Sequence, residues 1–244
     1  LDWQPFALLA ANIDIRQLQI QSLSIVLPQE KKADKAVTLP EFHLPWRVSL
    51  KDIVVDNFSI SREDQRLALK QIRLGASTLF QQLDIEDFSI DADGFSINIK
   101  GKVKPARNWQ HAIDIRWQAE LPASLMITGH GQLLGDMSVT RLKQKLTGPL
   151  QLTLAATINK LLDQPDWLAS IDATRPDAGK LHPNWPAISG KLHLEGQGNL
   201  ATAALTGNLD GQYPELGPVN GKFKLQRFSD NTIQLDNLEL RTPA

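Results

Sequence analysis

The chain has no cysteine, no long apolar run and, at its start, no glycine. The absence of cysteine from all 244 residues suits an oxidising compartment, where free thiols are a liability. No stretch approaches the roughly 18 consecutive apolar residues of a membrane-spanning helix, so we expect no transmembrane segment. All 15 glycines lie from Gly75 onward, and this composition shift divides a glycine-free part, residues 1–74, from a glycine-containing part, residues 75–244.

An excess of charge of either sign is missing as well. Charged residues make up 22% of the chain and the formal net charge is -1, so no electrostatic footprint for nucleic acid is present and we expect no nucleic-acid partner. Aromatic residues are only 6%, although 42% of the residues are hydrophobic, enough for one large all-β domain or a repeat array. Because the chain starts at Leu1, we interpret it as a piece of a longer protein, without a signal peptide.

One short pattern, apolar-x-apolar-x-x-apolar-x-apolar, organises the sequence. Its four copies are Leu18-Ile20-Leu23-Ile25, Ile53-Val55-Phe58-Ile60, Leu83-Ile85-Phe88-Ile90 and Ile233-Leu235-Leu238-Leu240. At 100° per residue these side chains would point all round a helix, so the pattern excludes an amphipathic helix. Each apolar-x-apolar half follows the two-residue period of a strand, and the x-x step shifts the phase by one. The pattern predicts two strand segments joined by a bulge or sharp bend, with one apolar face kept throughout.

Farther along the chain the alternation becomes strict. It predicts strands over residues 95–103 and 113–121, and one long strand over residues 146–158. Polar residues occupy the intervening positions, which is typical of antiparallel sheet with one face turned to water. We expect about 16 strands, and helix at most over one turn at residues 5–11. The sequence therefore predicts an all-β fold in one segment over residues 1–244.

No catalytic or metal-binding motif is present at the spacing that its chemistry needs. None of the five histidines pairs with another histidine at metal-ligand spacing, and His193 and Glu195 are interpreted as two outward polar positions of one strand. The runs 129–131 and 196–198, Gly-His-Gly and Gly-Gln-Gly, are interpreted as turns or strand kinks and not as phosphate loops. We therefore expect no enzymatic activity, no cofactor and no metal.

Several phrases of the sequence together resemble a known family. These are IDIRQLQIQSLSIVLP at 13–28, LPEFHLPWRVSLKDIVVDNFSI at 39–60, ARNWQHAIDIRWQAELP at 106–122 and HPNWPAISGKLHLEGQGNLATAALTGNLDG at 182–211. They are similar to the periplasmic body of the TamB family, AsmA-like proteins of Gram-negative envelopes. The resemblance implies an elongated, curved, U-shaped sheet (a β-taco) with an apolar concave groove, in a periplasmic protein anchored to the inner membrane. It also implies phospholipid transport between the two membranes.

The residues and the resemblance agree that apolar strand faces need a cover, and in a groove acyl chains supply it. The candidate groove-lining residues are Leu18, Ile20, Leu23, Ile25, Ile53, Val55, Phe58, Ile60, Leu83, Ile85, Phe88, Ile90, Ile97, Ile99, Ile113, Ile115, Trp117, Leu150, Leu152, Leu154, Leu192, Leu194, Phe223 and Leu225. The expected partners are phospholipid acyl chains, the remainder of the same chain and, through a part outside this sequence, a TamA-like outer-membrane barrel. The alternative is an assembly scaffold for outer-membrane proteins that works by β-strand addition.

Overall fold

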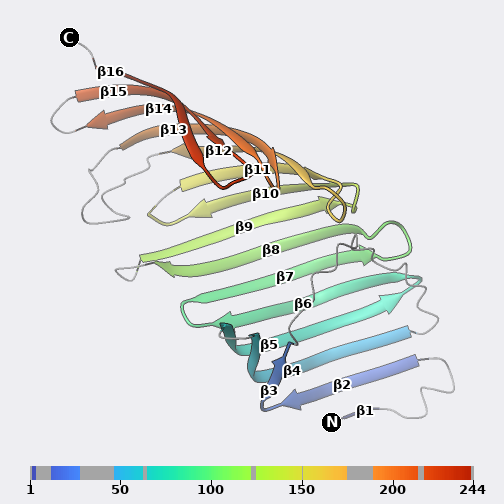
Figure 1. Ribbon diagram of the computed structural model, residues 1–244. Helices are drawn as coiled ribbons and strands as arrows, with labels where there is room; N and C mark the ends of the chain where they lie inside the picture. The colour runs from blue at the N-terminus through green and yellow to red at the C-terminus, as the bar shows by residue number, and fades with distance from the viewer. Residues whose placement is uncertain are drawn as a thin grey trace. The chain divides into compact units, whose positions relative to one another are not determined.

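The computed structural model is built from β-strands, as the sequence predicts (Figure 1). It describes residues 2–3, 12–27, 47–62, 65–121, 125–149, 151–174, 189–213 and 217–242. No helix occurs within these ranges, and they contain 16 strands. The helical turn considered at residues 5–11 and the candidate Leu150 lie outside the described residues.

Two units divide the chain, the first ending at Gln118 and the second beginning at Ala119. The strands of the first unit are β1 (Asp2–Trp3), β2 (Asn12–Ile20), β3 (Leu23–Val26), β4 (Arg47–Arg62), β5 (Gln65–Leu79), β6 (Gln82–Ala92), β7 (Phe95–Lys104) and β8 (Gln110–Leu121), of which β8 runs past the boundary. Those of the second unit are β9 (Leu125–Gly135), β10 (Val139–Thr147), β11 (Gln151–Asn159), β12 (Asp166–Thr174), β13 (Ser189–Asn199), β14 (Ala203–Tyr213), β15 (Gly217–Arg227) and β16 (Ile233–Arg241). The composition boundary at Gly75 falls inside β5 and so within the first unit.

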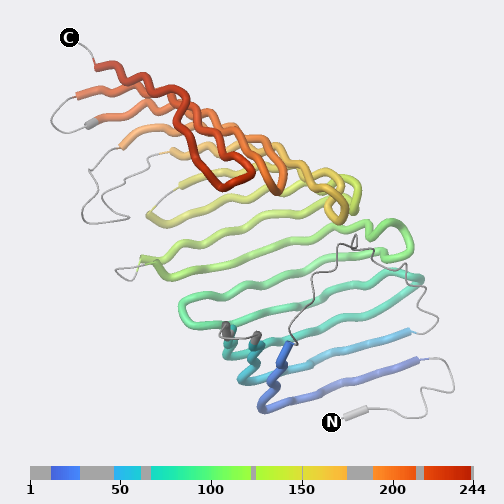
Figure 2. The backbone as a smooth tube through the Cα atoms, viewed as in Figure 1, coloured from blue at the N-terminus to red at the C-terminus, as the bar shows by residue number. Residues whose placement is uncertain are grey.

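The bent-strand pattern forms the bends and bulges that its spacing predicts. Between β2 and β3 the chain turns sharply at the first x-x step (Figure 2), and at the equivalent step of β4 Asn57 takes a positive φ of 50°. The x-x step of the third copy is a bulge between Ile85 and Phe88, where β6 pairs with β7. At the fourth copy the pairing of β15 with β16 skips residue 236, because Lys224 pairs with Asn237 and Leu225 pairs with Leu235.

The first two copies of the pattern lie side by side in parallel. Leu18 and Ile20 of β2 pair with Ile53 and Val55 of β4, and β3 pairs with the far half of β4 in the same register. Most other neighbours, including β9 to β16 in chain order, pair in antiparallel fashion. The prediction of antiparallel sheet is therefore confirmed, except that the first two copies of the pattern pair in parallel.

One predicted strand is wrong in its extent. Residues 146–158 form a hairpin and not one long strand, because β10 ends at Thr147 and β11 begins at Gln151. Leu146 pairs with Leu152 across this hairpin. Gly148 has a φ of 143°, a conformation open mainly to glycine, and Pro149 follows it. Since both Leu146 and Leu152 belong to the apolar phase, the alternation continues through the turn and hides it.

The two glycine runs are also placed by the structure. Residues 129–131 lie inside β9 and residues 196–198 lie inside β13, so neither run is a turn.

Very few apolar side chains are fully buried. Among the described residues the buried hydrophobic ones are Val54, Val55, Ala76 and Ala173, each no more than 9% exposed. The chain exposes 16670 Å², whereas the general scaling for compact folded proteins of 27.1 kDa gives about 11000 Å². A chain of this length would ordinarily bury a core of many residues, so within the described ranges the apolar phase of the strands is largely not packed against a second layer.

Candidate functional site

The candidate site is the apolar face of the strands, where predicted lining residues form continuous cross-strand rows. In the first unit one row is Leu18, Ile53, Leu74, Phe88 and Ile99, and the next row is Ile20, Val55, Ile72, Ile90 and Ile97. Side chains in directly paired positions of neighbouring strands are close enough to pack on one another. The registers thus bring residues that are up to 81 positions apart (99 − 18) into one apolar surface.

The second unit repeats the arrangement with glycines among the apolar residues. One of its rows is Leu154, Ile171, Leu194, Gly207, Phe223 and Leu238. A Cβ on Gly207 would lie 2.2 Å from Cζ of Phe223 and 2.8 Å from Cδ2 of Leu194. The Phe223 ring therefore lies over Gly207, whose lack of a side chain makes room for it.

Most candidate lining residues are half-buried. Of those that the structure describes, Val55 is buried, Leu23 and Ile25 are just over one third exposed, and the others are intermediate. Along β8 the half-buried side chains of Ile113, Ile115 and Trp117 alternate with the exposed Asp114 and Arg116. The predicted residues of the rows are thus paired across neighbouring strands within each unit, and their side chains are partly exposed.

Four buried polar residues interrupt this apolar phase, and sequence reasoning missed them. Thr140, Gln144, His111 and Thr78 are 2%, 8%, 7% and 7% exposed, and Thr78 pairs with the apolar Leu83. Thr140 Oγ1 donates a hydrogen bond to the backbone oxygen of Asp136 at 2.7 Å, whereas Gln144 Oε1 is buried without a hydrogen-bond partner. The sequence signal that could have found them is the two-residue spacing, since Thr140 and Gln144 share the strand phase of Leu142 and Leu146.

The opposite face is polar, and hydrogen bonds join its neighbouring strands. Near the bend in the first unit, Nε2 of Gln71 and Nε2 of Gln19 donate to Asp56 at 2.9 and 3.2 Å. These two hydrogen bonds, that from Gln71 first, hold the pKa of Asp56 below its ordinary value. Ser59 Oγ donates to Ser24 Oγ at 3.1 Å, which joins the serines that precede the last apolar residue of the first two copies.

His193 on β13 lies between two carboxylates of the polar face. Its Nδ1 is 2.6 Å from Oδ1 of Asp172 on β12, and its Nε2 is 3.4 Å from Oε1 of Glu195. The hydrogen bond with Asp172, and after it the one with Glu195, raises the pKa of His193 above its ordinary value. The two carboxylates approach opposite nitrogens of the ring, so they cannot chelate one metal ion together with it.

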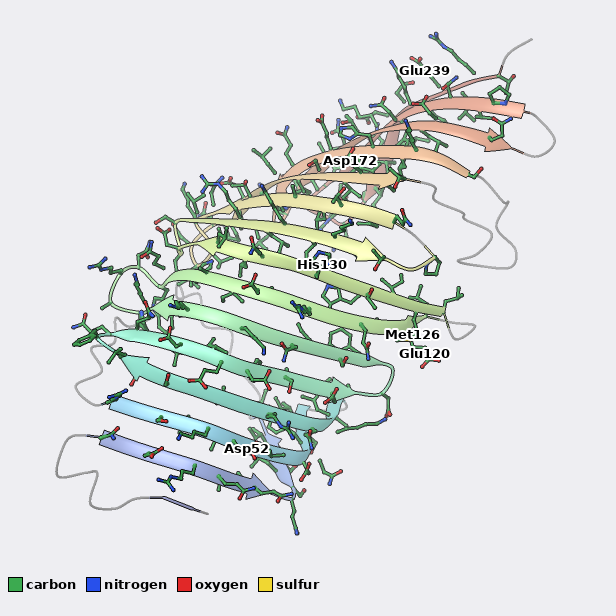
Figure 3. The ribbon with its side chains drawn as sticks, turned by 180° about the vertical axis from the view of Figure 1, so that it is seen from behind. Asp52, Glu120, Met126, His130, Asp172 and Glu239 are labelled. Carbon is green, nitrogen blue, oxygen red and sulfur yellow. The ribbon has the colours of Figure 1, made fainter. Side chains whose placement is uncertain are left out.

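His193 and Glu195 thus both face outward, as the sequence analysis expects. Asp172 is visible from the polar side of the second unit in Figure 3. In the described part of the chain no cluster of three or more metal-ligating side chains occurs. A search of the same ranges finds no helix with the length and apolarity needed to cross a membrane.

Comparison with known proteins matches nearly the whole chain to one family. Residues 8–244 match the family described as TamB, N-terminal domain. The chain belongs to the TamB family. No curated protein and no solved structure matches it. The resemblance drawn from the sequence phrases is therefore confirmed, and the match assigns the chain to the N-terminal domain of the TamB family.

The TamB-family assignment covers both units, because residues 8–244 include all strands from β2 to β16. It gives a context to the apolar rows but does not identify what lies on them. The hollows that the structure describes in the second unit are lined instead by residues of the polar phase, such as Lys143, Ser170 and Gln197.

Proposed function

We propose that this chain is a periplasmic segment of a lipid-transfer protein, in which the apolar strand face carries the acyl chains of phospholipid between the inner and outer membranes. The observation that carries the proposal is the combination of continuous apolar rows with very few buried apolar side chains among the described residues. Covering such a row with hydrocarbon contributes about 25 cal/mol per Å² of apolar surface removed from water. A bound acyl chain would therefore supply the second layer that the strands themselves do not provide.

The chemistry of the rows suits a hydrocarbon ligand that slides along the surface better than a ligand that is held in one pose. The rows of the first unit are aliphatic apart from phenylalanine, and aliphatic side chains offer no directional partner. Thr140, Gln144 and His111 are polar but buried, so they do not offer a fixed polar contact on the exposed surface. The proposal assigns no catalytic chemistry and no cofactor to the chain.

The partners follow from the family. We place the chain in the periplasm, as part of a protein that is anchored to the inner membrane and associates with a TamA-like outer-membrane barrel. Further chain of the same protein would continue the apolar rows beyond those seen here.

The test is direct identification of bound lipid. Organic extracts of the purified chain, analysed by mass spectrometry, should contain phospholipid, and native mass spectrometry should show lipid-bound species. Fluorescently labelled phospholipid should also bind the chain and be displaced by unlabelled phospholipid. Bare protein in all three measurements would contradict the proposal.

A scaffold for client β-strands is the second candidate, and the edge strand β16 favours it. All nine residues of β16 are exposed, and Ile233, Leu235, Leu238 and Leu240 are each more than half exposed. Among the described strands β16 pairs with β15 alone, and the edge of such a strand offers backbone groups to another strand. Alternate N–H groups of an edge strand point away from its sheet. Because residues 237 and 238 are consecutive, one of the two has an outward N–H group, and the corresponding variant, Asn237→Pro or Leu238→Pro, removes this donor. Loss of binding of a strand-forming peptide in that variant, with lipid binding kept, would favour the scaffold.

A further inference from the structure

The polar face of β10 carries an uncompensated row of cations. Arg141, Lys143 and Lys145 alternate along this strand, all three are exposed, and successive members are about 6.7 Å apart along the strand. Their directly paired neighbours on β9 are Leu134, Gln132 and His130, and those on β11 are Thr157, Ala155 and Thr153. None of these six is acidic. Within the described ranges no carboxylate lies at ion-pair distance from the three cations.

A hollow of about 640 Å³ opens beside two of these cations on the same face. Arg141 and Lys143 line it, while Lys145 does not. Small side chains of the next strands, among them Ala155, Thr157 and Ser170, leave the space open. Its volume lies within the range of about 300–1,000 Å³ that is usual for small-ligand sites.

The charges around the hollow favour an anion. Its other charged lining residues are Glu195 and Lys224. Glu195 already interacts with Nε2 of His193 at 3.4 Å, and Nζ of Lys224 is 3.6 Å from Oδ2 of Asp236. The unengaged charges are therefore both positive. A guanidinium binds phosphate oxygens through two parallel N–H donors, and an ammonium adds a compact positive charge.

We propose that this hollow on the polar face of β10–β15 binds a phosphoester group, with Arg141 and Lys143 as the cations that recognise the phosphate. The hydroxyls of Thr157 and Ser170 and the amide of Gln197, all on its lining, supply neutral donors. The site lies on the face opposite to the proposed acyl-chain surface, so it is separate from the proposed lipid-transfer function and stands or falls independently of it.

The first experiment measures binding of glycerol 3-phosphate to the purified chain by calorimetry. Arg141→Gln/Lys143→Gln should lower the affinity by about tenfold or more, because it removes both charge-assisted contacts. Ala155→Phe fills the hollow and keeps every charge, and it should abolish binding. Lys145→Gln is the matched control, a cation of the same strand and face outside the hollow, and it should change the affinity less than about twofold. Circular dichroism and thermal melting of each variant confirm that the fold is retained.

A second experiment distinguishes the two sources of a phosphoester. If the phosphate belongs to a lipid headgroup, vesicles of phosphatidylglycerol should bind in a sedimentation assay, and glycerol 3-phosphate should compete with them, whereas phosphatidylcholine vesicles should bind less. If the source is a soluble phosphoester, glycerol 3-phosphate should bind while neither vesicle does. Either result supports the site. Failure of the wild-type chain to bind glycerol 3-phosphate, or an equal loss in Lys145→Gln and the double variant, would overturn it.

Discussion

The half-buried apolar phase makes a sharp prediction about Ile115, in the middle of β8. Its neighbours Asp114 and Arg116 are exposed on the other face, whereas Ile115 itself is half-buried. In a closed sandwich Ile115→Asp would bury an unpaired carboxylate, at a cost of several kcal/mol. On an open face the carboxylate reaches water whenever lipid is absent. We expect the second result, with the fold retained and lipid binding reduced.

The structure supplies a matched position at which the opposite result is expected. Val55 is 9% exposed and is paired with Ile20 on one side and Ile72 on the other. Val55→Asp loses about 1.5–3 kcal/mol of apolar burial and adds the cost of the buried charge, so about 4 kcal/mol or more in total. Half-buried Ile115 loses roughly half the burial term, about 1 kcal/mol. For a unit of this size the two changes correspond to melting-temperature decreases of more than about 15 °C and about 5 °C.

Relative to the stability that each variant loses, lipid binding should weaken more in Ile115→Asp than in Val55→Asp. A carboxylate that displaces two or three methylenes from the apolar row costs about 2 kcal/mol, which weakens lipid binding about thirtyfold. Thermal melting and fluorescent-lipid titration of Ile115→Asp and of Arg116→Asp on the polar face separate the two effects. Arg116→Asp should leave both measurements near wild type. If Ile115→Asp unfolds the chain as Val55→Asp does, Ile115 belongs to a closed core, and the proposed acyl-chain surface does not include this position.

Three further predictions concern the fold and its charges. Gly131→Ala should lower the melting temperature by several degrees, because its Cβ would lie 1.9 Å from the backbone oxygen of Lys143. The Cβ of Gly196→Ala would meet only side-chain atoms, the Trp167 ring at 3.1 Å and Cδ1 of Leu205 at 3.3 Å, and should change the melting temperature less; equal effects would contradict this. The pKa of His193, followed by NMR, should fall toward its ordinary value near 6.5 in Asp172→Asn. Its ion pairs stabilise the fold fully below that ordinary pKa, and the contribution is lost as the pH rises through the raised pKa, so an unchanged titration would refute the contact. Circular dichroism should be dominated by β-sheet, and a helix content above about one quarter of the residues would contradict the fold.

The strand content and the bulges could be predicted because both are local. The apolar-x-apolar-x-x-apolar-x-apolar pattern fits a strand and not a helix, and its x-x steps coincide with the bend at Asn57 and the bulge between Ile85 and Phe88. The hairpin at residues 148–149 was missed because its two arms keep the same phase through the turn, so periodicity alone carries no sign of it. The dipeptide Gly148-Pro149 was the local signal in the sequence, and Gly148 takes a φ of 143° in the structure.

The candidate lining residues could be predicted as members of one face, but not as rows. Which residues become neighbours depends on register, and register is set by pairing between strands that lie far apart in the sequence. The parallel match of β2 with β4 is the exception, since the first two copies are 35 residues apart at every apolar position (53 − 18, 60 − 25). The polar hollow could not be predicted at all. Its lining comes from β10 to β15, and no single strand of the six carries a recognisable motif.

Aligned x-x steps explain how the apolar rows stay continuous. A slip of one residue turns every side chain of a strand to the opposite face, so an unmatched bulge would interrupt each row that it meets. Upstream of the first two copies the same spacing continues through Ile15 and through Leu50, which makes residues 16–17 and 51–52 a further pair of x-x steps. These skipped residues of β2 and β4 lie side by side, and the pairing of β4 with β5 also shifts there. The shift recurs at Gly75 of β5 and after Ile85 of β6, next to these positions in the sheet. Because these register shifts lie side by side, the apolar phase changes at the same place in each neighbouring strand. The rows therefore continue without interruption from Leu18 to Ile99. The spacing of the repeat is therefore what holds one apolar surface together across five strands.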